Sequence, residues 1–343
     1  MHRAKDALVE VSKSGAFVRT GAEFRTWIGD KHPAASKRYW LFVSAACPWA
    51  SRCLAVRQLK GLEECISVAV THPTWERTKP GDPNDTHCGW SFKHPNDAPI
   101  ANPAGFGLFP STGCSLPPKP FKNIRQVYEE DPSGKGVTKF TVPVLWDAQL
   151  ECIVNNESSE IIRMLNSDFN EFASNPSLDL YPEHLRESID AVNEWIYDDI
   201  NDGVYKCGFA RSQEAHDAAS ANLYAALDRA ESILQKQRYL VGSQITEADI
   251  RLFVTLVRFD PVYVVYFKCN QKRIADYQAL GAYTRDLYQT PGVAQSVFLD
   301  HIVHHYYSSH PVLNAYAVVP YGSHPDRVKA ALLQPHGRDE KKA

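Results

Sequence analysis

The hydrophobic and polar positions divide the chain into a mixed first part and a helical second part. Residues 38–44 and 65–70 are short runs of apolar, aromatic and β-branched residues, which are typical of buried strands. Residues 48–60, between these runs, are rich in helix formers and begin with a proline. A strand, a helix and a second strand joined by short turns predict a β-α-β unit whose two strands are parallel.

A long irregular stretch, residues 72–134, follows this unit and is rich in Pro, Gly, Asn, Asp and His. Loops of this length in compact domains are usually functional or disordered. The tryptophans and phenylalanines in the stretch argue against simple disorder. Near its end, residues 121–130 predict a short helix.

The next predicted elements are two strands and a helix. Residues 141–147 and 152–154 predict an antiparallel pair of strands joined by a tight turn, and a helix follows. Pro143 is either an ordinary edge proline or a cis proline, and the pattern leaves both open. Asn156 or Ser158 is expected to cap the helix.

From Glu183 onward, apolar residues recur with the helical period almost throughout. The predicted helices lie near residues 189–196, 223–234, 250–257, 273–288 and 292–306. Residues 246–249 form a capping box in which Asp249 replaces the usual Glu. The expected organisation is a 1–36 N-terminal arm, a 37–170 α/β domain containing the 72–134 insert, a 183–330 all-helical domain and a 331–343 flexible tail.

Cys47 stands in the turn between the first strand and its helix. Because Pro48 suits the first turn of a helix, Cys47 is expected at the helix N-terminus, where unpaired N–H groups and the helix dipole favour a thiolate. The alternative is a buried cysteine that packs as a small hydrophobe, but the strand–turn–Cys-Pro–helix order favours the thiolate. Ala50 occupies the position of a second redox cysteine, and Cys53 is nearly two helical turns away. An outside thiol must therefore resolve any mixed disulfide, and Cys53 is expected in the core.

Composition narrows the class of protein further. A chain of 343 residues fits two domains at about 150 residues each. The net charge of -3 gives no sign of the excess of basic residues that is typical of nucleic-acid-binding proteins. No apolar run approaches the ~20 residues that a helix needs to cross a membrane. The first residues lack the apolar segment of a secretory signal. Eight scattered cysteines fit a reducing cytoplasm.

Four histidines near the C-terminus lie at helical spacing, namely His301, His304, His305 and His310. Residues three or four apart share a helix face, which raises the question of a metal site. Neither an acidic residue nor a cysteine nearby completes a convincing ligand set, so no metal is expected.

Several segments carry specific motifs, at residues 47–50, 89–92, 141–147, 155–158, 200–210, 257–263, 267–270 and 305–307. An α/β domain with a Cys-Pro motif and a proline-bearing strand, followed by an all-helical domain, resembles the glutathione transferases. These motifs resemble one branch of that family, the glutathionyl-hydroquinone reductases of the Xi class. The resemblance extends from about residue 38 to 322 and implies a thioredoxin-like first domain, glutathione as co-substrate and a homodimer.

The resemblance also implies how glutathione is bound. Cys47 would be the catalytic thiolate, and the backbone of Val142, beside a cis Pro143, would pair with the peptide part of glutathione. Glu157 and Ser158 would hold the γ-glutamyl end. This is physically reasonable, because a ligand carboxylate can sit on helix N–H groups while Glu157 meets the ammonium group.

Two further sets of residues are implied. Trp90 and Arg125 would close over the glycyl end of glutathione, with Arg125 pairing with its carboxylate. Tyr205, Tyr263 and Tyr306 match the tyrosines that surround the hydroquinone. A lone tyrosine in a helical domain is usually a core or rim residue, but three within separate matching motifs favour a binding site.

The expected activity is that of an oxidoreductase. It reduces glutathionyl-hydroquinones to hydroquinones through a mixed disulfide of Cys47 and glutathione, and it releases oxidised glutathione. One alternative is an Omega-like thioltransferase or dehydroascorbate reductase, which shares the catalytic cysteine. Another is a non-catalytic ligand-binding module, against which the intact Cys47-Pro48 argues. Neither nucleic acid nor membrane is expected as a partner.

Overall fold

The computed structural model describes residues 10–12 and 14–339 of the chain. Its contacts define two compact units, which we describe separately. Of the described residues, the first unit comprises 21–177 and 295–320, and the second comprises 10–12, 14–20, 178–294 and 321–339. The predicted arm, residues 1–36, is thus shared between the two units, and its first nine residues lie outside the described part.

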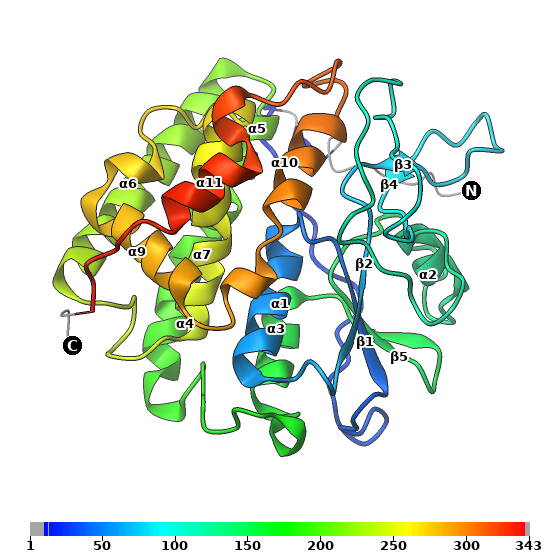
Figure 1. Ribbon diagram of the computed structural model, residues 1–343, viewed down its shortest axis with the longest axis horizontal. Helices are drawn as coiled ribbons and strands as arrows, with labels where there is room; N and C mark the ends of the chain where they lie inside the picture. The colour runs from blue at the N-terminus through cyan, green and yellow to red at the C-terminus, as the bar shows by residue number, and fades with distance from the viewer. Residues whose placement is uncertain (1–9, 13, 340–343) are drawn as a thin grey trace. The chain divides into compact units, whose positions relative to one another are not determined.

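The first unit is built on a four-stranded sheet with the order β2-β1-β5-β6 (Figure 1). Its strands are β1 (Tyr39–Val43), β2 (Ser67–Val70), β5 (Val144–Asp147) and β6 (Cys152–Asn155). β1 pairs with β2 in parallel and with β5 in antiparallel orientation, and β5 pairs with β6 in antiparallel orientation. Both the predicted β-α-β unit and the predicted antiparallel pair are therefore confirmed.

Helix α1 (Pro48–Lys60) has the bounds that the sequence predicts. It begins at Pro48, whose ring suits the first turn, and it ends where Gly61 adopts a left-handed φ of 64°. A Cβ atom on Gly61 would lie 2.7 Å from the Cβ of Ser174, so this turn needs glycine. α1 packs against α3 (Ser158–Ser167), and the two helices lie side by side next to the sheet (Figure 1).

The 72–134 insert is ordered around a few short elements. It contains β3 (Glu76–Arg77), which pairs with β4 (Cys88–Gly89), and α2 (Ile124–Glu130). An isolated bridge between Thr71 and Phe92 attaches the insert to the end of β2, and a bridge between Ser91 and Asn123 joins two segments of the insert itself. α2 begins three residues later than predicted, because Asn123 is extended and its side chain accepts a hydrogen bond from the Gln126 N–H at 3.0 Å.

The structure decides the two alternatives that the sequence left open before α3. The Val142–Pro143 peptide bond is cis, and β5 begins only after it, at Val144. Neither Asn156 nor Ser158 caps α3, so that prediction was wrong. Glu157 is the N-cap, and its carboxylate accepts hydrogen bonds from the Ser159 N–H and hydroxyl at 3.0 and 2.8 Å.

A buried charge network lies at the end of β5. Asp147 is fully buried and accepts hydrogen bonds from the Arg38 guanidinium at 2.6 Å and from His32 Nδ1 at 2.9 Å. Burial alone would raise the pKa of Asp147, but the hydrogen bonds from Arg38 and His32 outweigh it and hold that pKa at about 2. The network fixes the N-terminal segment, through His32, to the sheet.

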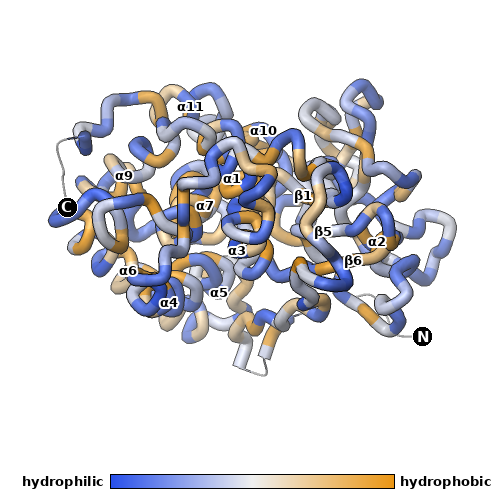
Figure 2. Tube along the Cα trace, turned by 90° about the horizontal axis from the view of Figure 1, so that it is seen from below, coloured by the Kyte–Doolittle hydropathy of each residue, from blue (hydrophilic) through white to orange (hydrophobic). Residues whose placement is uncertain are grey.

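The second unit is helical, as predicted. It contains α4 (Arg186–Trp195), α5 (Gly203–Phe209), α6 (Gln213–Lys236), α7 (Glu247–Arg258), α8 (Val264–Tyr266), α9 (Gln278–Gln289) and α11 (Pro325–Leu332). Short stretches of π-helix, residues 196–201 and 259–263, follow α4 and α7. Hydrophobic and hydrophilic positions are interspersed along these helices (Figure 2), and α7 is buried along its whole length. None of the helices in the described part of the chain is long and apolar enough to cross a bilayer.

The predicted capping box of α7 is present, with the Asp249 carboxylate 2.8 Å from the Thr246 N–H that donates to it. The C-terminal tail differs from the prediction, since the chain stays packed on the second unit to Arg338. That residue is 1% exposed, and its guanidinium donates hydrogen bonds to the carbonyls of Leu234, Gln237 and Arg238. Buried backbone acceptors thus hold a segment whose polar composition predicts fraying.

Helix α10 (Leu299–Ser308) belongs to the first unit, although the sequence assigned it to the helical domain. Its side chains bond to the insert of the first unit. The Ser308 hydroxyl lies 2.8 Å from the Thr74 hydroxyl, and His301 Nε2 lies 2.7 Å from the Thr112 carbonyl. The sequence pattern identified a helix here but not the unit that it completes.

Candidate functional site

Three segments that are far apart in the sequence meet at one edge of the sheet. Because β1 and β5 are antiparallel, the end of β1 lies beside the start of β5, and β6 ends at the same edge. The turn after β1 carries Cys47, Val142 comes just before β5, and Glu157 and Ser158 come just after β6. The sheet topology thus places four of the predicted site residues at one edge.

Cys47 is the N-cap of α1, in extended conformation, as the sequence predicts. Its thiol is half-buried, and its sulfur lies 3.6 Å from the carbonyl oxygen of Val142. The first turn of α1 contains no acidic residue. The N–H groups of that turn and the helix dipole act on the sulfur and favour the thiolate form.

Cys53 is fully buried on the same helix. Its sulfur lies 3.5 Å from the Trp49 carbonyl and 3.8 Å from the Ser158 carbonyl, in the packing of α1 against α3. Burial raises the pKa of the Cys53 thiol, which keeps it protonated. The prediction that Cys53 is a core residue is confirmed.

The N-terminus of α3 has the features of an anion site. The Ser158 side chain is buried, and its hydroxyl has no hydrogen-bond partner among the described residues. It stands in the first turn of a ten-residue helix, where unpaired N–H groups attract negative charge. The neighbouring Glu157 places a carboxylate at the same helix start. Opposite charges on one ligand would find complementary partners here.

Trp90 and Arg125 lie in the insert of the first unit. Trp90 is buried against the rings of Trp75 and His305. The Arg125 guanidinium is ion-paired with Asp85 at 2.6 Å and with Glu129 at 2.8 Å, and its hydrogen bond to Asp85 holds the pKa of that carboxyl at about 2. Two carboxylates thus engage Arg125, and its contact with a glycyl carboxylate stays a prediction.

The three predicted tyrosines are divided between the two units. Tyr205, on α5, and Tyr263, in the π-helical stretch after α7, bring their rings within 6.1 Å of each other in the second unit. Phe267 stacks on Tyr263 with ring centroids 5.3 Å apart. Tyr306, on α10, belongs to the first unit. π-helical turns are frequent at functional sites, but a role for these tyrosines in binding hydroquinone stays a prediction.

The sequence did not predict that Trp75 and His305 lie beside Trp90. Trp75 lies between β2 and β3, and His305 precedes the predicted Tyr306, so position was the only available signal. Of the other histidines of the C-terminal group, His301 bonds to the Thr112 carbonyl, and the His310 ring lies 5.4 Å from the His305 ring. Within the described ranges, no group of three His, Cys, Asp or Glu side chains could hold a metal.

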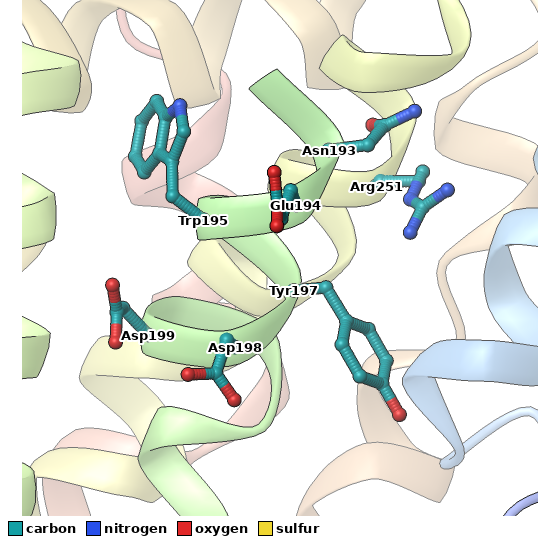
Figure 3. Close-up of a pocket in the computed structure, with 7 residues that line it drawn as sticks. All are labelled: Asn193, Glu194, Trp195, Tyr197, Asp198, Asp199 and Arg251. Carbon is teal, nitrogen blue, oxygen red and sulfur yellow. The ribbon is translucent and has the colours of Figure 1, made fainter. Parts of the chain in front are cut away.

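A cavity of about 550 Å³ in the second unit is a competing candidate (Figure 3). It is lined by Asn193, Glu194, Trp195, Tyr197, Asp198, Asp199 and Arg251. Figure 3 shows that Trp195 and Asp199 extend on one side of the helix, whereas Tyr197 and Arg251 extend on the other. Because its polar groups do not converge on one point, the cavity lacks the geometry of a catalytic site.

A cysteine that opens a helix beside a cis-proline strand, in a chain that also has an all-helical unit, defines the class as glutathione transferase. Both parts of the chain match family models of that class. The model described as glutathione S-transferase, N-terminal domain, matches residues 46–168, and the model for the C-terminal domain matches residues 213–286.

Three relatives are similar along nearly their whole length. Glutathionyl-hydroquinone reductase YqjG of Escherichia coli (strain K12) is 45% identical over 96% of this chain and 94% of that protein. The glutathione-bound structure of YqjG superposes with a TM-score of 0.78 at 41% identity. This superposition covers 92% of this chain and 96% of that one. Glutathione S-transferase omega-like 2 of Schizosaccharomyces pombe (strain 972) is 40% identical over 92% of this chain and 96% of that protein. The glutathione-S-transferase Xi from Phanerochaete chrysosporium has a TM-score of 0.81 at 44% identity, covering 92% and 95% of the two chains. The chain belongs to the glutathione S-transferase family, in its Xi class.

Proposed function

We propose that the chain reduces glutathionyl-hydroquinones to hydroquinones at the expense of glutathione. The observation that carries this proposal is the sulfur of Cys47 at the N-terminus of α1, 3.6 Å from the carbonyl of the residue that precedes the cis proline. A thiolate at this place can attack a glutathione sulfur, and Cys53, on the same helix, is buried in the core. The name of the E. coli relative supports the choice of substrate.

The proposed reaction has two steps. The Cys47 thiolate attacks the sulfur of the glutathione thioether, the carbon–sulfur bond breaks, and its electron pair and one proton go to the ring carbon. Hydroquinone leaves, and Cys47 remains as a mixed disulfide with glutathione. A second glutathione thiolate then attacks the glutathione sulfur of that disulfide, which releases oxidised glutathione and restores the Cys47 thiolate.

We assign glutathione to the edge of the sheet. The backbone of Val142 would pair with the peptide part of glutathione, and the start of α3, with Glu157 and Ser158, would hold the γ-glutamyl end. The unpartnered, buried Ser158 hydroxyl supports this assignment, since the ligand carboxylate would give it a partner. Trp90 and Arg125 would close over the glycyl end, which requires Arg125 to leave or share its present carboxylate partners.

The test of the function is a comparison of two substrates with the purified protein. A hydroquinone reductase should turn over a glutathionyl-hydroquinone far faster than dehydroascorbate, with oxidised glutathione formed in equal amount to hydroquinone. The reverse preference would replace the proposal with the Omega-like thioltransferase. Glutathione binding with neither activity would identify a ligand-binding module.

The tyrosines provide a second prediction. Replacing Tyr205, Tyr263 or Tyr306 by phenylalanine keeps the ring and removes only the hydroxyl, which would donate to a ring oxygen or help to protonate the leaving carbon. Each change should lower turnover of the hydroquinone thioether by roughly 10- to 100-fold, the range for one positioned group. Steady-state rates of the three variants would measure the loss.

Reduction of a small glutathione mixed disulfide is the control for the tyrosine variants. That substrate has no ring oxygens and needs no carbon protonation, so its rate should hardly change. Equal loss of both activities would mean that the tyrosines are structural. No loss of either would mean that the substrate is not a hydroquinone thioether.

We further propose that the protein is a cytoplasmic homodimer. A patch of exposed apolar side chains on the first unit supports a second copy as partner, since large patches of this kind usually mark interaction sites. Phe106 packs its ring 4.9 Å from Tyr316 in this patch, and the two residues are 42% and 68% exposed. Sedimentation velocity would detect the dimer, and a concentration-independent monomer would refute it. The eight cysteines, scattered along the chain, support a reducing compartment, which a fluorescent fusion would locate.

A further inference from the structure

Four rings of the first unit form an aromatic cluster, which we define as Trp75, Trp90, His305 and His310. The His305 ring lies 4.4 Å from the Trp90 ring at an interplanar angle of 37°. The Trp75 ring meets Trp90 edge to face at 5.4 Å and His310 at 4.8 Å. Trp90, which closes over glutathione in the proposed function, is therefore enclosed by rings from two other segments of the chain.

Hydrogen bonds fix the orientation of His305 within the aromatic cluster. His305 Nδ1 lies 2.9 Å from the Pro73 carbonyl oxygen and 2.9 Å from the Ser309 hydroxyl. Because a carbonyl can only accept, Nδ1 carries the proton and donates. The Ser309 hydroxyl in turn accepts a hydrogen bond from the backbone N–H of Trp75 at 3.0 Å. The end of α10 is thus attached to the segment that carries Trp75.

Ring contacts hold the centre of the aromatic cluster. Burial lowers the pKa of His310 to about 4, so this ring is neutral at physiological pH. The Trp75 Nε1 atom is buried and has no hydrogen-bond partner within the described residues. The ring contacts with Trp75 and His305 set the plane of Trp90 on this side.

We propose that His305 is a positioning residue for glutathione, because it holds the indole of Trp90 in the plane that the tripeptide requires. The inference rests on the proposed function, in which Trp90 contacts the glycyl end. The proposal assigns separate roles to two adjacent residues of α10, because Tyr306 is the expected contact of the hydroquinone. Loss of the Nδ1 hydrogen bond should loosen Trp90 without touching Cys47.

The test compares two adjacent histidines of α10. His305→Phe keeps a ring against Trp90 but removes the donor to Pro73, and it should raise the Kd for reduced glutathione by about tenfold. The matched control is His304→Phe, whose ring instead contacts Phe109 at 5.1 Å and should leave the Kd within about twofold. Isothermal titration calorimetry with reduced glutathione measures both. Equal effects of the two changes would overturn the inference.

A double-mutant cycle with Trp90→Leu separates positioning from general packing. If His305 acts through Trp90, the double variant should bind glutathione no more weakly than Trp90→Leu alone. Losses that add would overturn the inference. Should His305→Phe unfold the protein, Ser309→Ala removes one hydrogen-bond partner of Nδ1 and should weaken binding by about threefold in the same cycle.

The outcomes also separate this inference from the proposed function. Additive losses of glutathione affinity in a protein that still reduces glutathionyl-hydroquinones would overturn the inference alone. If the losses of glutathione affinity are non-additive but the protein does not reduce glutathionyl-hydroquinones, the inference is supported and the proposed substrate is refuted. Absence of glutathione binding by the unaltered protein would overturn both.

Discussion

Cys47→Ser should lower turnover of a glutathionyl-hydroquinone by at least about a thousandfold, because removal of a covalent nucleophile removes the whole reaction path. A serine hydroxyl at the start of α1 is not ionised near neutral pH and cannot attack a thioether sulfur. Affinity for glutathione should stay within about threefold of the original value, because the proposed binding contacts lie on Val142 and at the start of α3. Steady-state kinetics and calorimetry measure the two effects separately.

The control for this prediction is Cys53→Ser. Cys53 lies on the same helix but is fully buried between α1 and α3. Most of the activity should remain in this variant, with some loss of stability from the polar group in the core. Activity retained by Cys47→Ser would refute the mechanism. A comparable collapse in Cys53→Ser would instead indicate that both thiols take part.

Asp147→Asn should lower the free energy of unfolding by about 3–5 kcal/mol at pH 7. This is the range for removing one partner of a buried ion pair while the other charge stays buried. The amide has nearly the same shape as the carboxylate but leaves the Arg38 guanidinium, which is 9% exposed, without its anion. Urea unfolding followed by tryptophan fluorescence would report the change, since Trp146 is the neighbouring residue.

The effect of Asp147 should depend on pH in a defined direction. The folded pKa of about 2 is below the usual value of 3.8, so the carboxylate stabilises the fold fully above about pH 4. This contribution is lost as the pH falls from about 4 towards 2. The difference in stability between the original protein and Asp147→Asn should therefore shrink across that interval.

Glu151→Gln is a matched control in the turn that follows β5. Glu151 pairs with Lys119 at 3.0 Å, but its side chain is 57% exposed, so the change should cost under about 1 kcal/mol. Equal losses for both variants would mean that burial of the Asp147 network adds nothing. A difference that does not change with pH would mean that the pKa of Asp147 is not depressed.

Local chemistry explains which parts of the fold the sequence could predict. The bounds of α1 follow from Pro48 at its start and Gly61 at its end, because both residues act through their own backbone. The capping box of α7 is likewise contained in four consecutive residues. Cys47 was identifiable for the same reason, since strand, turn, cysteine and proline are adjacent.

Features that depend on distant partners could not be predicted in this way. The helical period of α10 reveals a buried face but not that this face completes the first unit through Thr74 and Pro73. The charge on Arg125 does not reveal Asp85, forty residues earlier, as its partner. Asn156 does not cap α3, because its side chain bonds to the Phe24 N–H and the Tyr128 hydroxyl, and Glu157 is the N-cap instead.

The return of α10 to the first unit has a consequence for how this protein is made. The Pro73 carbonyl and His305 Nδ1 are 232 residues apart in sequence, so the hydrogen bond between them cannot form until α10 has been synthesised. Domains generally fold from the N-terminus as they leave the ribosome, whereas this unit can be completed only after residues 295–320 have emerged. The rings of Trp75 and Trp90 can therefore meet His305 only after the helical unit has been translated. Under the proposed function, the part of the glutathione site that includes Trp90 is accordingly completed late in the synthesis of the protein.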